Sequence, residues 1–124
     1  MSIPVLKQRG VLIVSVQEAV SDRDLEQLKD DLAEQVGRFR SHGVVIDVSA
    51  LDVMVSFATR TLTGIAHATR LRGAETVVVG IQPEVAFAMI QLGLALDNVA
   101  TALDLEEGVE LLTARKHRSS DGGI

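Results

Sequence analysis

The sequence has 124 residues, 47% of them apolar and 23% charged, with a net charge of −5 and no cysteine. Length and composition fit one folded domain, and the acidic balance with only three aromatic residues argues against nucleic-acid binding. No apolar run approaches the roughly 20 residues that cross a bilayer, and the start lacks the pattern of a signal peptide. We therefore expect a cytoplasmic protein with no disulfide, no membrane contact and no nucleic-acid partner.

The first forty residues predict a β-hairpin followed by a helix. Apolar segments at residues 3–8 and 11–16 flank an Arg-Gly pair, which is typical of two strands joined by a tight turn. Ser21 is a favoured cap for a helix over residues 22–40. The helix carries one apolar stripe at spacings of three and four: Leu25, Leu28, Leu32, Val36 and Phe39.

Apolar and helical segments alternate through the rest of the chain. β-branched runs predict buried strands at residues 44–48 and 76–81, and a shorter run at residues 99–103 predicts an edge strand. Three further helices are expected, the second opening at Pro83 and the third at an acidic capping box: residues 56–73, 83–94 and 105–115.

This alternation predicts a single α/β domain with a mixed, mostly parallel sheet of four or five strands and about four helices, joined by right-handed crossovers. We assign residues 1–113 to that domain. Residues 114–124 contain a basic cluster followed by small polar residues, which predicts a polar, disordered C-terminal tail.

Catalytic and metal-binding motifs are missing from the sequence. It contains no glycine-rich phosphate loop followed by lysine and no GxSxG nucleophile turn. The three histidines, His42, His67 and His117, are too widely spaced to form a metal-ligand pair on one helix. We therefore predict a non-enzymatic protein without a metal or a cofactor.

Asp47 ends a central predicted strand, the position that the phospho-accepting aspartate occupies in a receiver domain. Such a domain also needs an acidic pair after its first strand and a lysine late in its sheet, and no lysine lies between Lys29 and Lys116. We therefore expect Asp47 to hydrogen-bond the turn that follows it, and Ser49 to brace the same turn.

Ser56 lies at or near the first turn of the second predicted helix. Free backbone N–H groups and the positive end of the helix dipole favour an anionic group there. A phosphate would add a charge of about −1.5 to −2 beside Asp47 and Asp52, so it would repel one class of partner and attract another. The residues alone equally allow Ser56 to be a simple helix cap, which contributes about 0.5–2 kcal/mol.

Three segments resemble the STAS domain of anti-anti-sigma factors and, within that family, the RsbS branch of stressosome scaffolds: GVVIDVSALDVMVSFATRTL, GAETVVVGIQPEVAFAMIQLGL and VATALDLEEGVELL. The first contains the strand, loop and helix start at which the family carries its phosphorylated serine. The resemblance runs from Ile3 to about Leu112. RsbR-type relatives carry an additional N-terminal sensor domain that we do not find in this sequence, which favours the RsbS branch.

The resemblance implies a non-enzymatic regulator that forms homodimers, co-assembles with RsbR-type STAS paralogues into a large shell and holds an RsbT-type switch serine/threonine kinase. Under stress that kinase phosphorylates one serine of the scaffold and leaves, and the matching residue here is Ser56. Thr59 is a remote second candidate, because the paralogues are phosphorylated at threonines. The predicted docking face surrounds this serine: Asp52, Val55, Ser56, Thr59 and Arg60, with Gln82 on a neighbouring turn.

Val55 departs from the family pattern, which places an acidic residue directly before the phosphorylated serine. A carboxylate favours a helix N-terminus, so its replacement by valine is expected to slow phosphorylation of Ser56 or to change kinase binding.

Two other functions stay open. A simple anti-anti-sigma factor would bind an anti-sigma kinase without shell assembly, and it would stay a small species even with RsbR-type partners. A nucleotide-binding or nucleotide-hydrolysing STAS domain is the third reading, and nothing in the sequence requires it.

Overall fold

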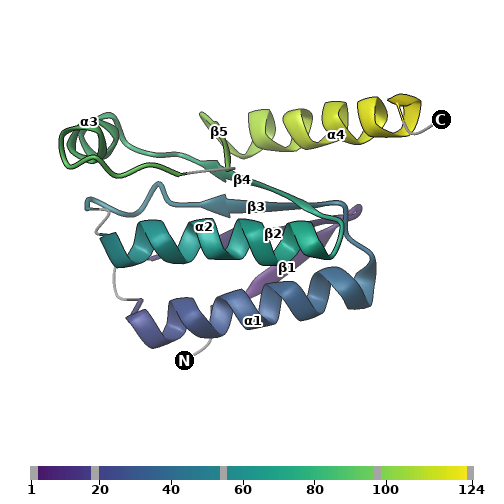
Figure 1. Cartoon of the computed structure of the whole chain (residues 1–124), viewed down its shortest axis with the longest axis horizontal. Helices are drawn as coiled ribbons and strands as arrows, with labels where there is room; N and C mark the ends of the chain where they lie inside the picture. Colours follow the sequence, from purple (N-terminus) through teal and green to yellow (C-terminus); the bar gives the residue numbers. More distant parts are fainter. Residues whose placement is uncertain (1–2, 18–19, 54–55, 97–98, 123–124) are drawn as a thin grey trace.

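The chain folds into one mixed sheet with helices on both faces (Figure 1). The structure is a computed structural model that describes residues 3–17, 20–53, 56–96 and 99–122, with the backbone alone for residues 56 and 117–122.

The sheet has five strands in the order β1-β2-β3-β4-β5. The hairpin pairs β1 and β2 antiparallel, and every later neighbour is parallel. The hairpin turn uses Arg9 and Gly10, both at positive φ, which is the backbone twist that two-residue hairpin loops favour. The strand bounds are as follows: β1 Val5–Gln8, β2 Val11–Ser15, β3 Gly43–Asp47, β4 Glu75–Val79 and β5 Ala100–Ala102.

Four helices connect or follow these strands: α1 Asp22–Phe39, α2 Ser56–Leu71, α3 Pro83–Gln91 and α4 Leu105–Gly122. Figure 1 shows α1 and α2 side by side along one face of the sheet and α4 on the other. The α/β fold class and the element types predicted from the sequence are confirmed.

Alternation along the strands produces two cores. In β2, Leu12 and Val14 face α1 and α2, whereas Val11 lies in the smaller core under α4. Gly43 and Gly108 permit the close approach of α4 to the sheet. A Cβ atom on Gly43 would lie 2.7 Å from Leu112 Cδ1, and one on Gly108 would lie 2.7 Å from Val79 Cγ1. The sheet is therefore covered on both faces, and its loops gather at its two ends.

Helix ends follow the capping rules. Ser21 accepts a hydrogen bond from the Asp24 N–H while Asp24 accepts one from the Ser21 N–H, which is a complete capping box. At α4, Asp104 accepts from the Glu107 N–H, but Glu107 accepts from the Leu103 N–H instead of the cap residue itself.

Helix α4 is longer than the sequence pattern predicts. It continues through residues 116–122, a segment that carries no apolar stripe. The division into a domain and a disordered tail stays a prediction.

Candidate functional site

The carboxyl ends of the parallel strands carry two loops that contact each other, and we call this end of the molecule the carboxyl edge. The β3–α2 loop begins at Asp47, whose Oδ1 accepts a 2.8 Å hydrogen bond from the Ser49 N–H. The backbone carbonyl of Asp47 accepts another from the Val16 N–H at 2.9 Å. Asp47 therefore shapes the turn after its own strand, as the sequence predicts.

The β4–α3 turn packs directly against that loop. Gly80 adopts a φ of +80°, and a Cβ atom there would lie 2.9 Å from the Ser49 Cβ, so only glycine fits without a shift. Gln82 then donates from Nε2 to the Ser49 carbonyl at 2.9 Å and to Asp52 Oδ1 at 3.3 Å. One side chain thus joins two loops that precede different helices.

Ser56 is the first residue of α2, so the chain enters a helix there, at the edge described above. The first N–H groups of a helix have no partner within it and favour a negative group. The side chain of Ser56 and the whole of Val55 lie outside the described residues. Their predicted roles in phosphorylation and docking stay predictions.

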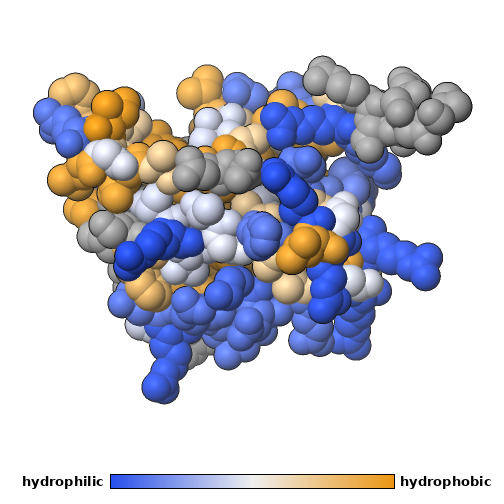
Figure 2. All heavy atoms as spheres, viewed as in Figure 1, coloured by the Kyte–Doolittle hydropathy of each residue, from blue (hydrophilic) through white to orange (hydrophobic). Residues whose placement is uncertain are grey.

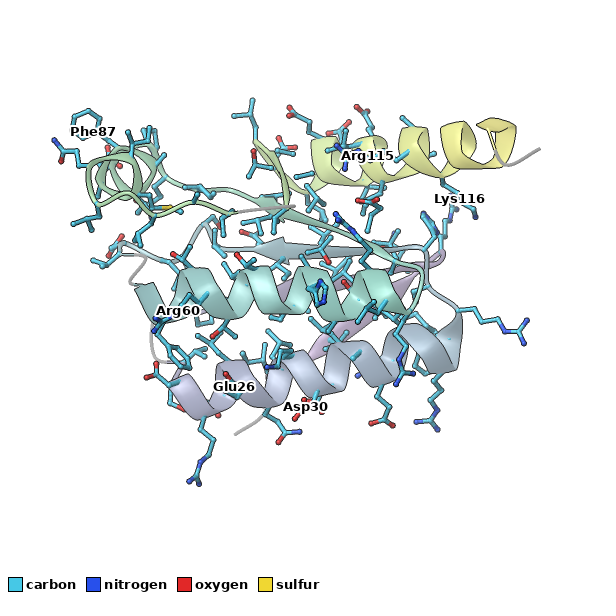
Figure 3. The ribbon with its side chains drawn as sticks, viewed as in Figure 1. Glu26, Asp30, Arg60, Phe87, Arg115 and Lys116 are labelled. Atoms are coloured by element: carbon cyan, nitrogen blue, oxygen red, sulfur yellow. The ribbon has the colours of Figure 1, made fainter. Side chains whose placement is uncertain are left out.

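Arg60 and Asp52 are both exposed beside the helix start. Arg60 lies one turn after Ser56, on the same side of α2, and Figure 3 shows its side chain extending outward from the first part of that helix. Gln82 is half-buried between the two loops. These placements agree with a surface that another protein can reach.

The prediction that Thr59 belongs to the exposed docking face is wrong. Thr59 is only 3% exposed, because it shares the inner side of α2 with the buried Leu62 and Ala66, at spacings of three and four. A kinase cannot reach the Thr59 hydroxyl in this structure. Thr59 is therefore neither part of the docking face nor a candidate for phosphorylation. The neighbouring Thr61 and Thr63 donate their hydroxyls to carbonyls four residues earlier in the helix.

Exposed carboxylates collect at the carboxyl edge because each of the four helices follows one of the parallel strands and so starts there. Asp22 opens α1 and Glu84 opens α3, each in a first turn where acidic residues are favoured, and Asp52 lies in the loop between β3 and α2. Hydrogen bonds from Ser21 lower the pKa of Asp24, so it too is charged at neutral pH. The edge is therefore acidic around the start of α2.

Sequence reasoning missed an apolar surface on α3. Phe87 is 62% exposed and Ile90 is 77% exposed, while Val85 and Met89 on the opposite side of the helix join the core. Figure 2 shows the resulting apolar patch over α3, and Figure 3 shows Phe87 pointing away from the sheet. Its signal in the sequence is the unbroken apolar run at residues 85–90, which is more than one buried face of a helix requires.

Neither a metal centre nor a membrane span is found in the described part of the chain. No group of three His, Cys, Asp or Glu side chains is arranged to hold a metal ion there. Within the same residues, no helix is both long and apolar enough to cross a membrane.

The strand order, the two cores and the joined loops define the class: a mixed α/β domain whose helices start at an acidic carboxyl edge. The chain belongs to the STAS domain family, whose model matches residues 2–108.

Two solved structures resemble it over nearly their full length. RsbS from Moorella thermoacetica, with one serine replaced by glutamate, is 35% identical with a TM-score of 0.79, covering 93% of this chain and 97% of that one. The second is a chain in a structure described as the molecular architecture of the stressosome, a signal integration and transduction hub. It is 36% identical with a TM-score of 0.77, and the match covers 91% of this chain and 98% of that one. The resemblance noted in the sequence is therefore confirmed.

A curated relative is the RsbT co-antagonist protein RsbRA of Bacillus subtilis, which is 30% identical over 100 residues. The match covers 78% of this chain and 36% of RsbRA. A second co-antagonist from the same organism, RsbRD, is 23% identical over 100 residues and is likewise covered to 36%. The chain thus spans about a third of the length of the curated relatives it matches.

Proposed function

We propose that this protein is a non-enzymatic scaffold and phospho-switched regulator in a stressosome-type signalling complex. It binds RsbR-type STAS paralogues and an RsbT-type switch kinase, and it releases the kinase when Ser56 is phosphorylated. The observation that carries the proposal is the start of α2 at Ser56, at the carboxyl edge. The likeness to RsbS and to a stressosome chain supports the kind of assembly.

The carboxyl edge provides the two parts that such a switch needs, a surface that binds the kinase and a site whose charge changes on phosphorylation. Phe87 and Ile90 form an exposed apolar surface on α3, the helix that begins directly after Gln82, and exposed apolar patches mark protein-binding sites. Phosphate on Ser56 adds about −1.5 to −2 charge to a surface that already carries Asp52 and Glu84. A kinase bound through apolar or acidic groups is repelled, whereas the helix start and Arg60 accommodate the phosphate within the fold.

The direct test incubates the protein with an RsbT-type kinase and ATP and maps phosphopeptides by mass spectrometry. We expect labelling at Ser56 and its loss in Ser56→Ala. Ser49→Ala is the matched control, because it removes an exposed hydroxyl from the same edge and should leave labelling unchanged. Labelling elsewhere, with Ser56 unmodified, contradicts the proposal.

Val55 provides a second test of the same site. Val55→Asp restores a carboxylate at the helix start, where it interacts favourably with the dipole. We expect this variant to be phosphorylated faster than the parent protein or to bind the kinase with a different affinity. Equal rates and equal affinities would mean that the residue before Ser56 has no role.

Assembly separates the scaffold from a simple anti-anti-sigma factor. Mixed with RsbR-type paralogues, the protein should enter a large complex that sedimentation or light scattering detects. A small species under every mixing ratio would favour the two-partner alternative instead.

A further inference from the structure

The opposite end of the sheet, where the parallel strands begin, contains a cavity of about 350 Å³. It lies between the end of α2, the start of β4 and the middle of α4, and we call it the amino-edge cavity. Its volume falls within the range of small-ligand sites. The described residues that line it are His42, Arg70, Gly73, Ala74, Glu75, Leu112, Arg115 and Lys116.

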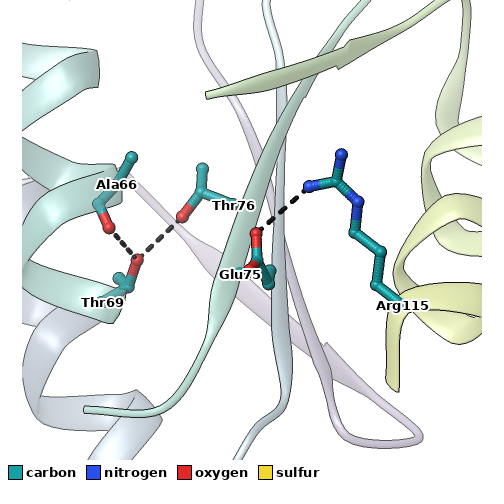
Figure 4. A network of polar contacts seen from close by, with 5 residues as sticks. All are labelled: Ala66, Thr69, Glu75, Thr76 and Arg115. Atoms are coloured by element: carbon teal, nitrogen blue, oxygen red, sulfur yellow. Dashed lines mark hydrogen bonds and ion pairs between the residues drawn. The ribbon is translucent and has the colours of Figure 1, made fainter. Parts of the chain in front are cut away.

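The lining is cationic in a protein whose net charge is −5. Arg70, Arg115 and Lys116 face one carboxylate, Glu75. Arg115 Nη1 lies 3.3 Å from Glu75 Oε2, with both side chains 42% exposed (Figure 4), so this pair is a weak one. Among the described residues, no carboxylate lies within ion-pair distance of the Lys116 ammonium. Positive charge therefore remains in the cavity after pairing.

His42 lines this cavity and also a neighbouring one between the β1–β2 hairpin and α4. Its Nε2 is buried and has no hydrogen-bond partner within the described residues. Burial, followed by the nearby charge of Lys116, lowers the pKa of this imidazole, so the ring is neutral at pH 7. Buried polar atoms nearly always have a partner, so this nitrogen is available to hydrogen-bond a bound molecule.

We infer that the amino-edge cavity binds a small phosphate-class anion. Arginine presents a planar set of donors that matches phosphate oxygens, and lysine adds a mobile point charge. Arg115 and Lys116 would provide the main contacts, since Arg70 also complements the carboxyl end of α2. The site lies at the opposite end of the strands from Ser56, so the inference does not depend on the proposed switch.

The test titrates the protein with inorganic phosphate at pH 7.5 and follows its backbone amides by NMR. We expect saturable shifts at Gly73, Ala74 and Glu75, which line the cavity, at an ionic strength held constant with chloride. Arg115→Gln and Lys116→Gln should each weaken binding about tenfold, the effect of losing a charge-assisted hydrogen bond. Arg23→Gln removes an exposed arginine from the first turn of α1, at the other end of the sheet; it is the matched control and should bind like the parent.

Glu75→Gln makes the test independent of damage to the fold. Removal of the one carboxylate among the described lining residues should tighten phosphate binding several-fold, which a merely disrupted site would not do. Adenosine monophosphate is titrated in parallel: tighter binding than phosphate identifies a nucleotide phosphate as the ligand, and equal or weaker binding identifies the free anion. Non-saturating shifts, or shifts unaltered in all three cavity variants, would overturn the inference.

Discussion

Gln82 donates a 2.9 Å hydrogen bond from Nε2 to the backbone carbonyl of Ser49, 33 residues earlier in the chain. The contact joins the loop before α2 to the turn before α3, so it helps to fix the positions of the two helix starts relative to each other. Gln82 makes no side-chain cap bond to α3 itself. Its role is therefore to join the loops.

Replacement of Gln82 should loosen the carboxyl edge. Gln82→Ala leaves the Ser49 carbonyl without this donor, and we expect a loss of about 0.5–1.5 kcal/mol in the free energy of unfolding, together with weaker kinase binding. Urea unfolding measures the first effect. Gln91→Ala, an exposed residue at the end of the same helix, should change neither, and equal effects of the two substitutions would remove the special role of Gln82.

Two glycines should respond to alanine in opposite directions. Gly108 is buried, and its added Cβ would lie 2.7 Å from Val79 Cγ1, so we expect Gly108→Ala to destabilise the fold by about 1–3 kcal/mol. Gly64 in α2 meets only Lys29 Cδ at 3.6 Å, an ordinary contact. Gly64→Ala should therefore stabilise by about 0.4–1 kcal/mol. Thermal unfolding of both variants checks the difference in sign.

The buried hydroxyls of Thr69 and Thr76 lie 2.8 Å apart, and Thr69 also donates toward the Ala66 carbonyl at 3.2 Å (Figure 4). Thr69→Val leaves the Thr76 hydroxyl buried and unpartnered, which should cost about 1–3 kcal/mol. Thr76→Val should cost less, because Thr69 keeps its carbonyl partner.

The double variant of these threonines decides whether the pair is coupled. Replacement of both hydroxyls by methyl groups removes the orphan, so Thr69→Val with Thr76→Val should be less destabilised than Thr69→Val alone. A double-mutant cycle from urea unfolding measures the coupling. Strict additivity would mean that the two hydroxyls do not act on each other.

His42 predicts a pH-dependent stability. Its pKa lies below the ordinary value of 6.5 in the folded protein, so the unfolded chain binds more protons in that range. The free energy of unfolding should therefore fall as the pH drops from 7.5 to 5.5, and His42→Gln should flatten that slope. His67→Gln removes an exposed histidine and serves as the control. An unchanged slope in His42→Gln would assign the dependence to other groups.

Most of the fold is predictable because local signals agree with the tertiary structure. The Arg-Gly turn, the Ser21 cap and the proline at the start of α3 each lie where an element begins or changes direction. The C-terminal end of α4 is the exception, because no local signal predicts it. Its last turns have no apolar stripe, and periodicity is the signal from which a helix is predicted.

The sites were harder to predict for two physical reasons. From the sequence, Thr59 is expected to be a polar surface residue. A threonine in a helix can nevertheless be buried, because its hydroxyl can donate to a carbonyl of the preceding turn, as the hydroxyls of Thr61 and Thr63 do here. The amino-edge cavity combines residues from four separate segments. Only the parallel register, which places Gly43 beside Glu75, brings them together.

The sheet order repeats the order of the strands in the chain. Each strand after the hairpin can therefore add to an edge that already exists, without waiting for a distant segment. Each addition closes a loop of only one helix and its connections, and the entropy lost in closing loops rises slowly with their length. Synthesis from the N-terminus can thus build this domain outward from its hairpin, with β5 closing the series.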